Sequence, residues 1–354
     1  MSRPPAAPAL TLPRTAGDRT LVVAEISANH GGSLDRALQV VEAAAAAGAD
    51  AIKIQSYTPD TLTLDSDRPE FRIDGGPWGG RTLYQLYQEA HTPPEWFPTL
   101  RDAAAALGVP LFSTPFAPAT VRFLAEKGAS AFKVSSFELT DLELLAAVAA
   151  TRRPVLLSTG MATAAEIAAA VAQVRQVWAG SDHGLCLLHC VSAYPAAPGD
   201  MHLATVADLA TRFGVVPGLS DHTLGTAVAV AAVALGARVV EKHFTLRRAD
   251  GGPDSHFSLE PDELRELVAA VRAVEAAVGS VRYGPKPGEQ PSLQFRRSIF
   301  LVRDVARGQP LTRADVRVIR PGQGLAPRHL PEVLGRALVR DCPAGTPLSW
   351  ELLA

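Results

Sequence analysis

The sequence predicts an α/β fold, an eight-stranded (β/α)₈ TIM barrel followed by a small β-rich domain. Between Leu21 and about Gly279, short β-branched runs alternate with longer alanine-rich stretches of helical periodicity, which is typical of βα units around a parallel sheet. Eight such units in roughly 260 residues match the size of a closed barrel. A doubly wound open sheet is the alternative, but no G-x-G-x-x-G turn follows the first strand.

The expected strands share β-branched or apolar residues and are short. They are residues 21–26, 51–55, 110–113, 131–136, 154–158, 185–190, 215–220 and 238–244. Helical patterns follow them, for example at residues 34–48, which end on a glycine, and at residues 164–178. Residues 57–92 and 245–260 depart from the repeat, and both fall where a barrel carries its active-site loops.

With 354 residues, the chain is long for one compact domain, and its composition divides it into four parts. Residues 1–20 contain four prolines and lack the apolar core of a signal peptide, so we expect a flexible leader. Residues 21–282 form the predicted barrel, and residues 283–295 form a Pro/Gly-rich linker. Residues 296–354 contain three short β-type runs and many turn residues, which predicts a separate module.

Composition and charge exclude several classes of function. The formal net charge of −2 provides no global positive field for nucleic acid or an anionic membrane. The longest apolar stretch, residues 227–240, is interrupted by a glycine and an arginine and is too short to cross a bilayer. The three cysteines, Cys186, Cys190 and Cys342, imply neither a disulfide nor a zinc site. We therefore expect a cytoplasmic protein with neither a nucleic-acid nor a membrane partner.

Polar side chains stand at or just after all eight predicted strand ends, where a barrel places its active site. One lysine or serine in such a place is more often solvated or capping than catalytic, so the coincidence at all eight ends carries the argument. In the second strand, Lys53 and Gln55 share one face and can both point into the barrel. The strand-end residues are Glu25, Asn29, His30, Lys53, Gln55, Ser113, Thr114, Lys133, Ser135, Ser136, Glu138, Ser158, Thr159, Gly160, Ser192, Tyr194, Ser220, Asp221, His222, Glu241, Lys242 and His243.

His222 and His243 follow adjacent predicted strands, which places two imidazoles within reach of one cation. Two protein ligands leave open positions for water and substrate, as a Lewis-acid site requires. A structural role for either histidine alone is an open alternative. Asp221 is expected outside the ligand set, because neighbouring strand residues point to opposite faces.

Lys53 and Lys133 project from different strands. Together with the hydroxyl groups of Ser113, Thr114, Ser136 and Ser158, they can clamp a small dianion that carries phosphate and carboxylate. The enzymatic alternative is a Schiff-base aldolase, which needs one desolvated lysine and no metal. The histidine pair argues against the aldolase.

Several motifs together resemble those of one enzyme family. The segments AEISANHGGSLDRAL, ADAIKIQSYTPDTLTLD, FSTPFAP, FKVSSFEL, STGMAT, SAYPAAP, GLSDHTLG and EKHFTL…GGPDSHFSLEP are similar to the sialic acid synthase family. The C-terminal RRSIFLVRDVARGQPLT…IRPGQGL…AGTPLSWE resembles its antifreeze-like (SAF) domain. The resemblance covers nearly the whole chain from about residue 20. Within the family, the long insertion, the SAYPAAP segment and the last barrel loop resemble pseudaminic acid synthases more than N-acetylneuraminate synthases.

The resemblance implies an enzyme that condenses phosphoenolpyruvate with 2,4-diacetamido-2,4,6-trideoxy-L-altrose, giving pseudaminate and phosphate with C–O cleavage. It implies that His222 and His243 bind a divalent ion, Mn²⁺ or else Mg²⁺ or Co²⁺, and that Glu25 is the acid/base residue. The residues implied to hold phosphoenolpyruvate are Lys53, Thr114, Lys133, Ser136, Ser158, Ser220 and Arg320. Those implied to meet the sugar are Gln55, Glu138, Tyr194 and Asp254.

In this family the SAF domain of one subunit caps the barrel of the other. The resemblance therefore implies a domain-swapped homodimer, in which Arg320 of one subunit reaches into the site of the other. The nearest alternative is an N-acetylneuraminate or legionaminate synthase; Ser192, which stands where N-acetylneuraminate synthases commonly have asparagine, supports a different sugar. An alternative of another class is a non-catalytic sugar-binding or ice-binding protein, which predicts disrupted polar residues at the strand ends.

Overall fold

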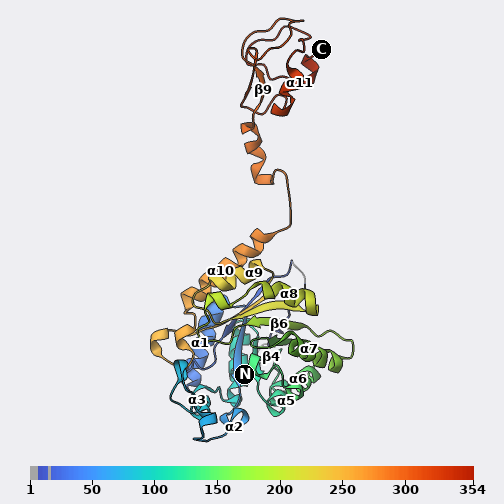
Figure 1. Ribbon diagram of the computed structural model, residues 1–354. Coiled ribbons are helices and arrows are strands. Elements are labelled where there is room, and N and C mark those ends of the chain that lie inside the picture. Colours follow the sequence, from blue (N-terminus) through green and yellow to red (C-terminus); the bar gives the residue numbers. More distant parts are fainter. Residues whose placement is uncertain (1–6, 15–16) are drawn as a thin grey trace. The chain divides into compact units, whose positions relative to one another are not determined.

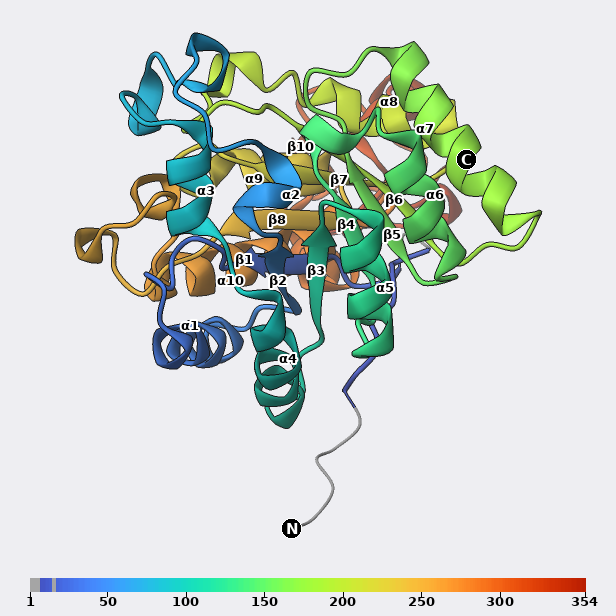
Figure 2. The same ribbon diagram turned by 90° about the horizontal axis from the view of Figure 1, so that it is seen from below.

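The computed structural model describes residues 7–14 and 17–354, and the chain divides into two compact units after Gly279. In the first unit, eight parallel strands close into a barrel with helices on its outside (Figures 1 and 2). The predicted barrel is therefore confirmed, and each strand lies within two residues of its expected bounds. The strands are β1 (Leu21–Glu25), β2 (Ala51–Ser56), β3 (Leu111–Pro115), β4 (Phe132–Val134), β5 (Val155–Ser158), β6 (Leu185–Cys190), β7 (Val216–Asp221) and β8 (Val239–His243).

The helices begin and end at residues that the sequence marks. Ser33 caps the first helix by accepting a hydrogen bond from the backbone N–H of Arg36, and Gly48, with φ of +92°, follows its last turn. The helices of the first unit are α1 (Leu34–Ala46), α2 (Pro59–Leu62), α3 (Leu83–Ala90), α4 (Phe97–Ala106), α5 (Pro118–Glu126), α6 (Leu142–Ala150), α7 (Ala164–Trp178), α8 (Ala204–Phe213), α9 (Ala227–Ala234) and α10 (Pro261–Val278). The irregular segment 57–92 thus contains α2 and α3.

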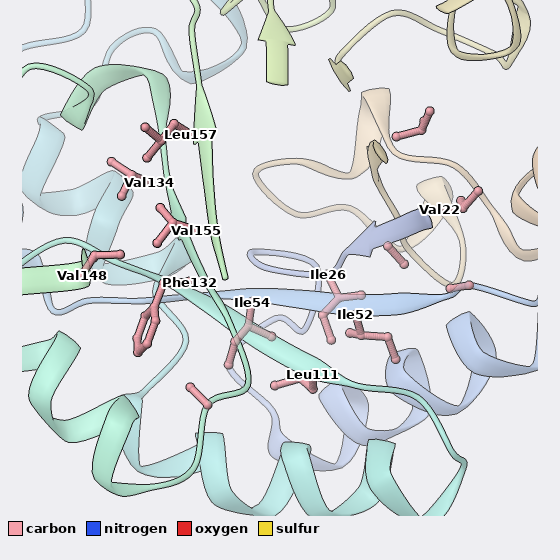
Figure 3. Close-up of a cluster of buried hydrophobic side chains, with 14 of the residues drawn as sticks. Val22, Ile26, Ile52, Ile54, Leu111, Phe132, Val134, Val148, Val155 and Leu157 are labelled. Atoms are coloured by element: carbon pink, nitrogen blue, oxygen red, sulfur yellow. The ribbon is translucent and has the colours of Figure 1, made fainter. Parts of the chain in front are cut away.

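Alternation along the strands separates two apolar cores. One set of side chains, which includes Ile52, Ile54 and Phe132, points away from the barrel axis and packs against the helices (Figure 3). The other set, which includes Val23 and Leu188, fills the interior at the amino ends of the strands. The next inward residues toward the carboxyl ends of the strands are mostly polar, among them Lys53, Lys133 and Glu241, so a polar layer lies directly above this inner core.

The N-terminal segment closes the amino end of the barrel. Leu10 and Leu12 are each 4% exposed and pack with Val23 and Val239 of the inner core. The expectation of a flexible leader over residues 1–20 is therefore wrong for this part, because two leucines cover apolar surface that would otherwise meet water. The expectation for residues 1–6 and 15–16 lies outside the described residues.

The second unit begins at Ser280, just before the expected linker, residues 283–295, most of which forms a 3₁₀ helix, η8 (Pro287–Phe295). Beyond it, β9 (Ser298–Leu301) and β10 (Val316–Ile319) form an antiparallel pair, and α11 (Leu330–Val333) follows. The third expected β-type run forms isolated bridges and no strand. An apolar core of its own stabilises this unit. No helix among residues 7–14 and 17–354 is long and apolar enough to cross a membrane.

Candidate active site

A buried carboxylate, Glu241 of β8, is the centre of the polar layer inside the barrel. Its Oε1 lies 3.0 Å from Nζ of Lys133 and 3.5 Å from Nζ of Lys53, and it accepts a hydrogen bond of 3.2 Å from the hydroxyl group of Ser220. Glu241 is 3% exposed and each of the two lysines is no more accessible than that. One carboxylate therefore joins three of the predicted phosphoenolpyruvate residues.

A second carboxylate, Glu25 of β1, completes this network. The register of β1 places Glu25 opposite both Lys53 of β2 and His243 of β8. Its carboxylate forms an ion pair with Lys53 and accepts a hydrogen bond of 2.8 Å from the backbone N–H of Ser27. Lys53 also donates to Oγ1 of Thr114 at 3.3 Å. The predicted acid/base residue thus lies between the lysine pair and the histidine pair.

The two cations dominate the electrostatics of this layer. Burial alone would raise the pKa of Glu241, but Lys133 and Lys53 outweigh it and lower the pKa to about 2. Burial also disfavours the charged form of Lys53, yet Glu241 and Glu25 raise its pKa above the ordinary value. The pKa of Lys133 is lowered by burial and by Lys53. Without a ligand, Glu241 is therefore the anion that both ammonium groups share.

Hydroxyl groups line the side of the layer formed by β4, β5 and β6. Ser136 accepts a hydrogen bond of 3.1 Å from the backbone N–H of Gly160. A Cβ atom at Gly160 would lie only 2.8 Å from Oγ of Ser136 and 2.5 Å from Oγ of Ser192, so only glycine fits there. The Oγ of Ser158 is buried and has no hydrogen-bond partner in the described part of the chain. This hydroxyl group is therefore free to donate to a bound molecule.

His222 and His243 lie next to each other at the ends of β7 and β8, with ring centroids 5.4 Å apart. Nδ1 of His222 lies 3.0 Å from the carbonyl oxygen of Val191, which can only accept, so Nε2 remains available to bind a cation. Burial lowers the pKa of His243 well below its ordinary value, and its buried Nδ1 has no hydrogen-bond partner among the described residues. Oδ2 of Asp254 lies 3.4 Å from that nitrogen. This donor set fits a divalent transition metal.

The two imidazoles are the metal ligands that the sequence predicts. Among residues 7–14 and 17–354, no group of three or more His, Cys, Asp and Glu side chains is arranged to hold a metal. Burial lowers the pKa of His222, but its contact with Cys190 and the charge of Glu241 outweigh burial and raise the pKa. A cation in this space would therefore compete with a proton on His222.

An aromatic wall stands beside the histidine pair. The ring of Tyr194 lies 4.4 Å from that of His222, 5.3 Å from Phe257 and 5.3 Å from Trp78, measured between centroids. Nε1 of Trp78 donates to the carbonyl oxygen of Pro253 at 2.9 Å, which ties the segment 57–92 to the loop after β8. Both irregular segments therefore meet over the site, as their positions in the sequence predict.

The remaining predicted sugar residues surround this wall. Burial and the charge of Glu25 raise the pKa of Asp254 to about 7. Glu138 lies in a 3₁₀ turn (Ser136–Glu138) and pairs with the hydroxyl group of Ser135, and burial raises its pKa. Gln55 is half-buried at the end of β2, two residues beyond Lys53 on the same face.

Two of the strand-end residues, Asn29 and Asp221, belong to the scaffold. Nδ2 of Asn29 donates to the carbonyl oxygen of Phe244 and to Oγ of Ser258, which holds the loop after β8. Asp221 points away from the imidazoles and pairs with Lys242, as expected from its place beside His222. Arg320 is not among the residues that the barrel brings together; it follows β10 in the second unit, where its side chain is exposed.

Sequence reasoning named Glu241 at a strand end but gave it no role, and it missed Trp78 and Phe257. A signal for Glu241 was present, because Glu241 and His243 are two residues apart in one strand and so share the inward face. No comparable signal exists for Trp78 or Phe257, which lie in aperiodic loops.

His30 is buried, contacts Oγ1 of Thr92 at 3.1 Å and packs against Trp96, so it too is structural. Burial, His91 and Arg36 lower its pKa to about 4. The folded state therefore resists protonation, and the stability contributed by neutral His30 is complete above pH 6.5 and is lost as the pH falls toward 4. We expect the wild type to lose about 2 kcal/mol more than His30→Asn between pH 7 and pH 5 in urea unfolding followed by circular dichroism. Equal losses would contradict this assignment.

Two family models match this chain: NeuB over residues 40–283 and the SAF domain over residues 296–354. The chain belongs to the NeuB family. The family and the C-terminal domain expected from the motifs are thereby confirmed.

Relatives of this NeuB-family chain match it along most of its length. Pseudaminic acid synthase of Campylobacter jejuni (strain 81-176) is 41% identical over 330 residues, which cover 93% of this chain and 95% of that protein. Pseudaminic acid synthase of Helicobacter pylori (strain 26695) is 38% identical, with 93% and 96% covered. Among solved structures, N-acetylneuraminic acid (sialic acid) synthetase of Leptospira borgpetersenii, in complex with citrate, is 31% identical with a TM-score of 0.70, and 79% and 92% of the two chains are covered.

Proposed function

We propose that this chain condenses phosphoenolpyruvate with 2,4-diacetamido-2,4,6-trideoxy-L-altrose to give pseudaminate and phosphate, the reaction of a pseudaminic acid synthase. The observation that carries the proposal is the near full-length similarity, at 41% and 38% identity, to two proteins of that name. The site supports it, because a buried lysine pair and a histidine pair share one barrel mouth.

The lysine pair and the hydroxyl groups suit phosphoenolpyruvate, which carries a phosphate and a carboxylate. Lys53 and Lys133 provide two cations, and Ser136, Ser158 and Ser220 provide donors at the same end of the barrel. Holding the dianion here presents its C3 atom to an aldehyde bound near the histidines. Phosphate then leaves with C–O cleavage when water adds at C2.

His222 and His243 would hold a divalent ion, for which we propose Mn²⁺, with Mg²⁺ or Co²⁺ as alternatives. When bound, this ion supplies Lewis-acid polarisation of the sugar aldehyde. Glu25 lies opposite His243 and next to Lys53, where it can take a proton from water or give one to the new alkoxide. Tyr194 and Asp254, together with Gln55 and Glu138, would meet the sugar.

We further propose that the enzyme is a domain-swapped homodimer, in which the SAF domain of a second copy caps the barrel. Residues 280–354 contain 12 Lys and Arg against six Asp and Glu, whereas residues 1–279 contain 22 against 30. The two units therefore carry opposite formal charges. Phe137, Met161 and Leu224, which are 59%, 66% and 65% exposed, stand on the loops after β4, β5 and β7 and form an apolar rim that a second copy would cover.

The alternatives have less support. The charges of Glu241 and Glu25 raise the pKa of Lys53, which disfavours this lysine as the nucleophile of a Schiff-base aldolase. A non-catalytic sugar-binding or ice-binding protein predicts disrupted polar residues, yet Glu25, His222 and His243 are in place with the lysines. All three cysteines are free and buried, which supports a reducing cytoplasm as the proposed location.

The test is phosphate release from phosphoenolpyruvate in the presence of Mn²⁺ with three sugars in parallel: the diacetamido-trideoxy-altrose, N-acetylmannosamine and the legionaminate precursor. We expect kcat/KM for the first sugar to be at least about tenfold higher, because buried polar groups reject a sugar that leaves them unpaired. Preference for N-acetylmannosamine would assign an N-acetylneuraminate synthase, and preference for the legionaminate precursor would assign a legionaminate synthase. Release with none of the three sugars, in a folded protein that binds Mn²⁺, would refute the reaction class.

A further inference from the structure

A second buried ion pair lies directly behind the two histidines. Lys242 stands between Glu241 and His243 in β8, so its side chain points to the opposite face of the strand. The lysine side chain is 1% exposed, and its Nζ lies 3.0 Å from Oδ2 of Asp221. It also donates to the carbonyl oxygen of Thr223 at 2.5 Å. The other carboxylate oxygen of Asp221 accepts the backbone N–H of Thr223 at 2.9 Å.

These bonds enclose His222. The pairing of β7 with β8 ends at Asp221 opposite Lys242, so His222 is the first residue beyond the ladder. On the side of β6, two contacts of 3.0 Å hold His222. Its Nδ1 lies against the carbonyl oxygen of Val191, and its own carbonyl oxygen accepts a hydrogen bond from the backbone N–H of Ala196. On the side of β8, Lys242 bonds to the residues immediately before and after His222. Lys242 therefore links the main chain around His222 to the residue next to His243.

Stability alone does not explain a lysine here. Removing two charges from water is costly, and apolar residues of similar volume often replace a buried ion pair without loss of stability. Apolar residues cannot replace the directional hydrogen bonds that the ammonium group of Lys242 donates to Asp221 and to the carbonyl oxygen of Thr223. Those bonds fix the main chain on both sides of His222 relative to the residue next to His243.

We infer that Lys242 and Asp221 are positioning residues for a metal site, which hold His222 and His243 at the separation that one divalent cation requires. The inference rests on the proposed function, because it takes the histidine pair to be the metal-binding pair. It assigns Lys242 and Asp221 no contact with the metal or with substrate. Partners that orient metal ligands typically change metal affinity by about ten- to a hundredfold when they are removed.

The test is the Kd of Mn²⁺ alone, measured by isothermal titration calorimetry on the full chain without substrates. Lys242→Met keeps the length and most of the apolar stem and removes all three donors, and we expect Kd to rise by about ten- to a hundredfold. The double variant Lys242→Met/Asp221→Asn leaves no buried charge unpaired, so it protects the test against loss of folding, and the same weakening is expected. Lys242→Arg retains the charge and donors and should recover part of the affinity.

Arg272→Met is the matched control. Arg272 pairs with Asp50 and donates to the carbonyl oxygen of Thr20, next to the amino end of β1. Its loss removes a different ion pair, which is partly buried and lies at the opposite end of the same barrel. We expect the melting temperature of this control to fall while its Kd for Mn²⁺ stays at the wild-type value.

His222→Ala separates the two ways in which the inference can fail. If the wild type binds Mn²⁺ and His222→Ala does not, the metal site stands. Wild-type affinity in both Lys242→Met and the double variant would then overturn the positioning role alone. If the wild type itself binds no Mn²⁺, the proposed metal site and this inference are overturned together.

Discussion

Replacing Glu241 with glutamine is expected to lower kcat by about 100-fold and to destabilise the ligand-free protein by about 3–5 kcal/mol. The physical reason is that the amide leaves Lys133 and Lys53 beside a neutral group in a buried layer. Lys53 retains Glu25, but Lys133 has no other ion-pair partner among the described residues. The measurements are steady-state phosphate release and urea unfolding followed by circular dichroism.

Phosphoenolpyruvate should reverse part of this destabilisation. A bound dianion would pair with the two ammonium groups that glutamine leaves uncompensated, so saturating phosphoenolpyruvate should raise the melting temperature of Glu241→Gln more than that of the wild type. Glu275→Gln is the control, because Glu275 pairs with Arg272 away from the site. Wild-type turnover and stability in Glu241→Gln, or equal stabilisation by the ligand in both proteins, would contradict the central role of this carboxylate.

The fold was predictable because each βα unit of the barrel has a recognisable pattern within a short stretch of sequence. The run at Leu21 and the helix that ends before Gly48 are recognisable from periodicity and capping over a few residues. The leader was misjudged for the opposite reason. Leu10 and Leu12 form no periodic pattern among four prolines, and only the closed barrel shows the apolar surface that they cover.

The site residues also differ in whether local sequence patterns or long-range contacts place them. His222 and His243 were predictable, because adjacent parallel strands bring their ends together whatever the rest of the chain does. The role of Glu241 was not, because its partner Lys133 lies 108 residues away and the contact crosses the inside of the barrel. The contact of Trp78 with Tyr194 depends on the path of an aperiodic loop, for which spacing in the sequence gives no guide.

The largest effect of all is expected for His222→Ala, which should lose Mn²⁺ binding and turn over at least about 1,000-fold more slowly, because one imidazole leaves a divalent ion weakly held.

Arg320→Ala should raise KM for phosphoenolpyruvate by about ten- to a hundredfold, since a charge-assisted hydrogen bond is lost. The two changes impair different steps and lie on different units of the chain.

The two variants together test whether the site is shared between copies. In a domain-swapped heterodimer of His222→Ala with Arg320→Ala, the barrel that keeps His222 is capped by the SAF domain that keeps Arg320, so one of the two sites is fully wild type. Co-expression with two different affinity tags isolates this heterodimer, and we expect about half of the wild-type kcat per dimer at the wild-type KM. If Arg320 served its own barrel, the heterodimer would not exceed the mean of the two parents. If no heterodimer were recovered, the proposed dimer would be wrong.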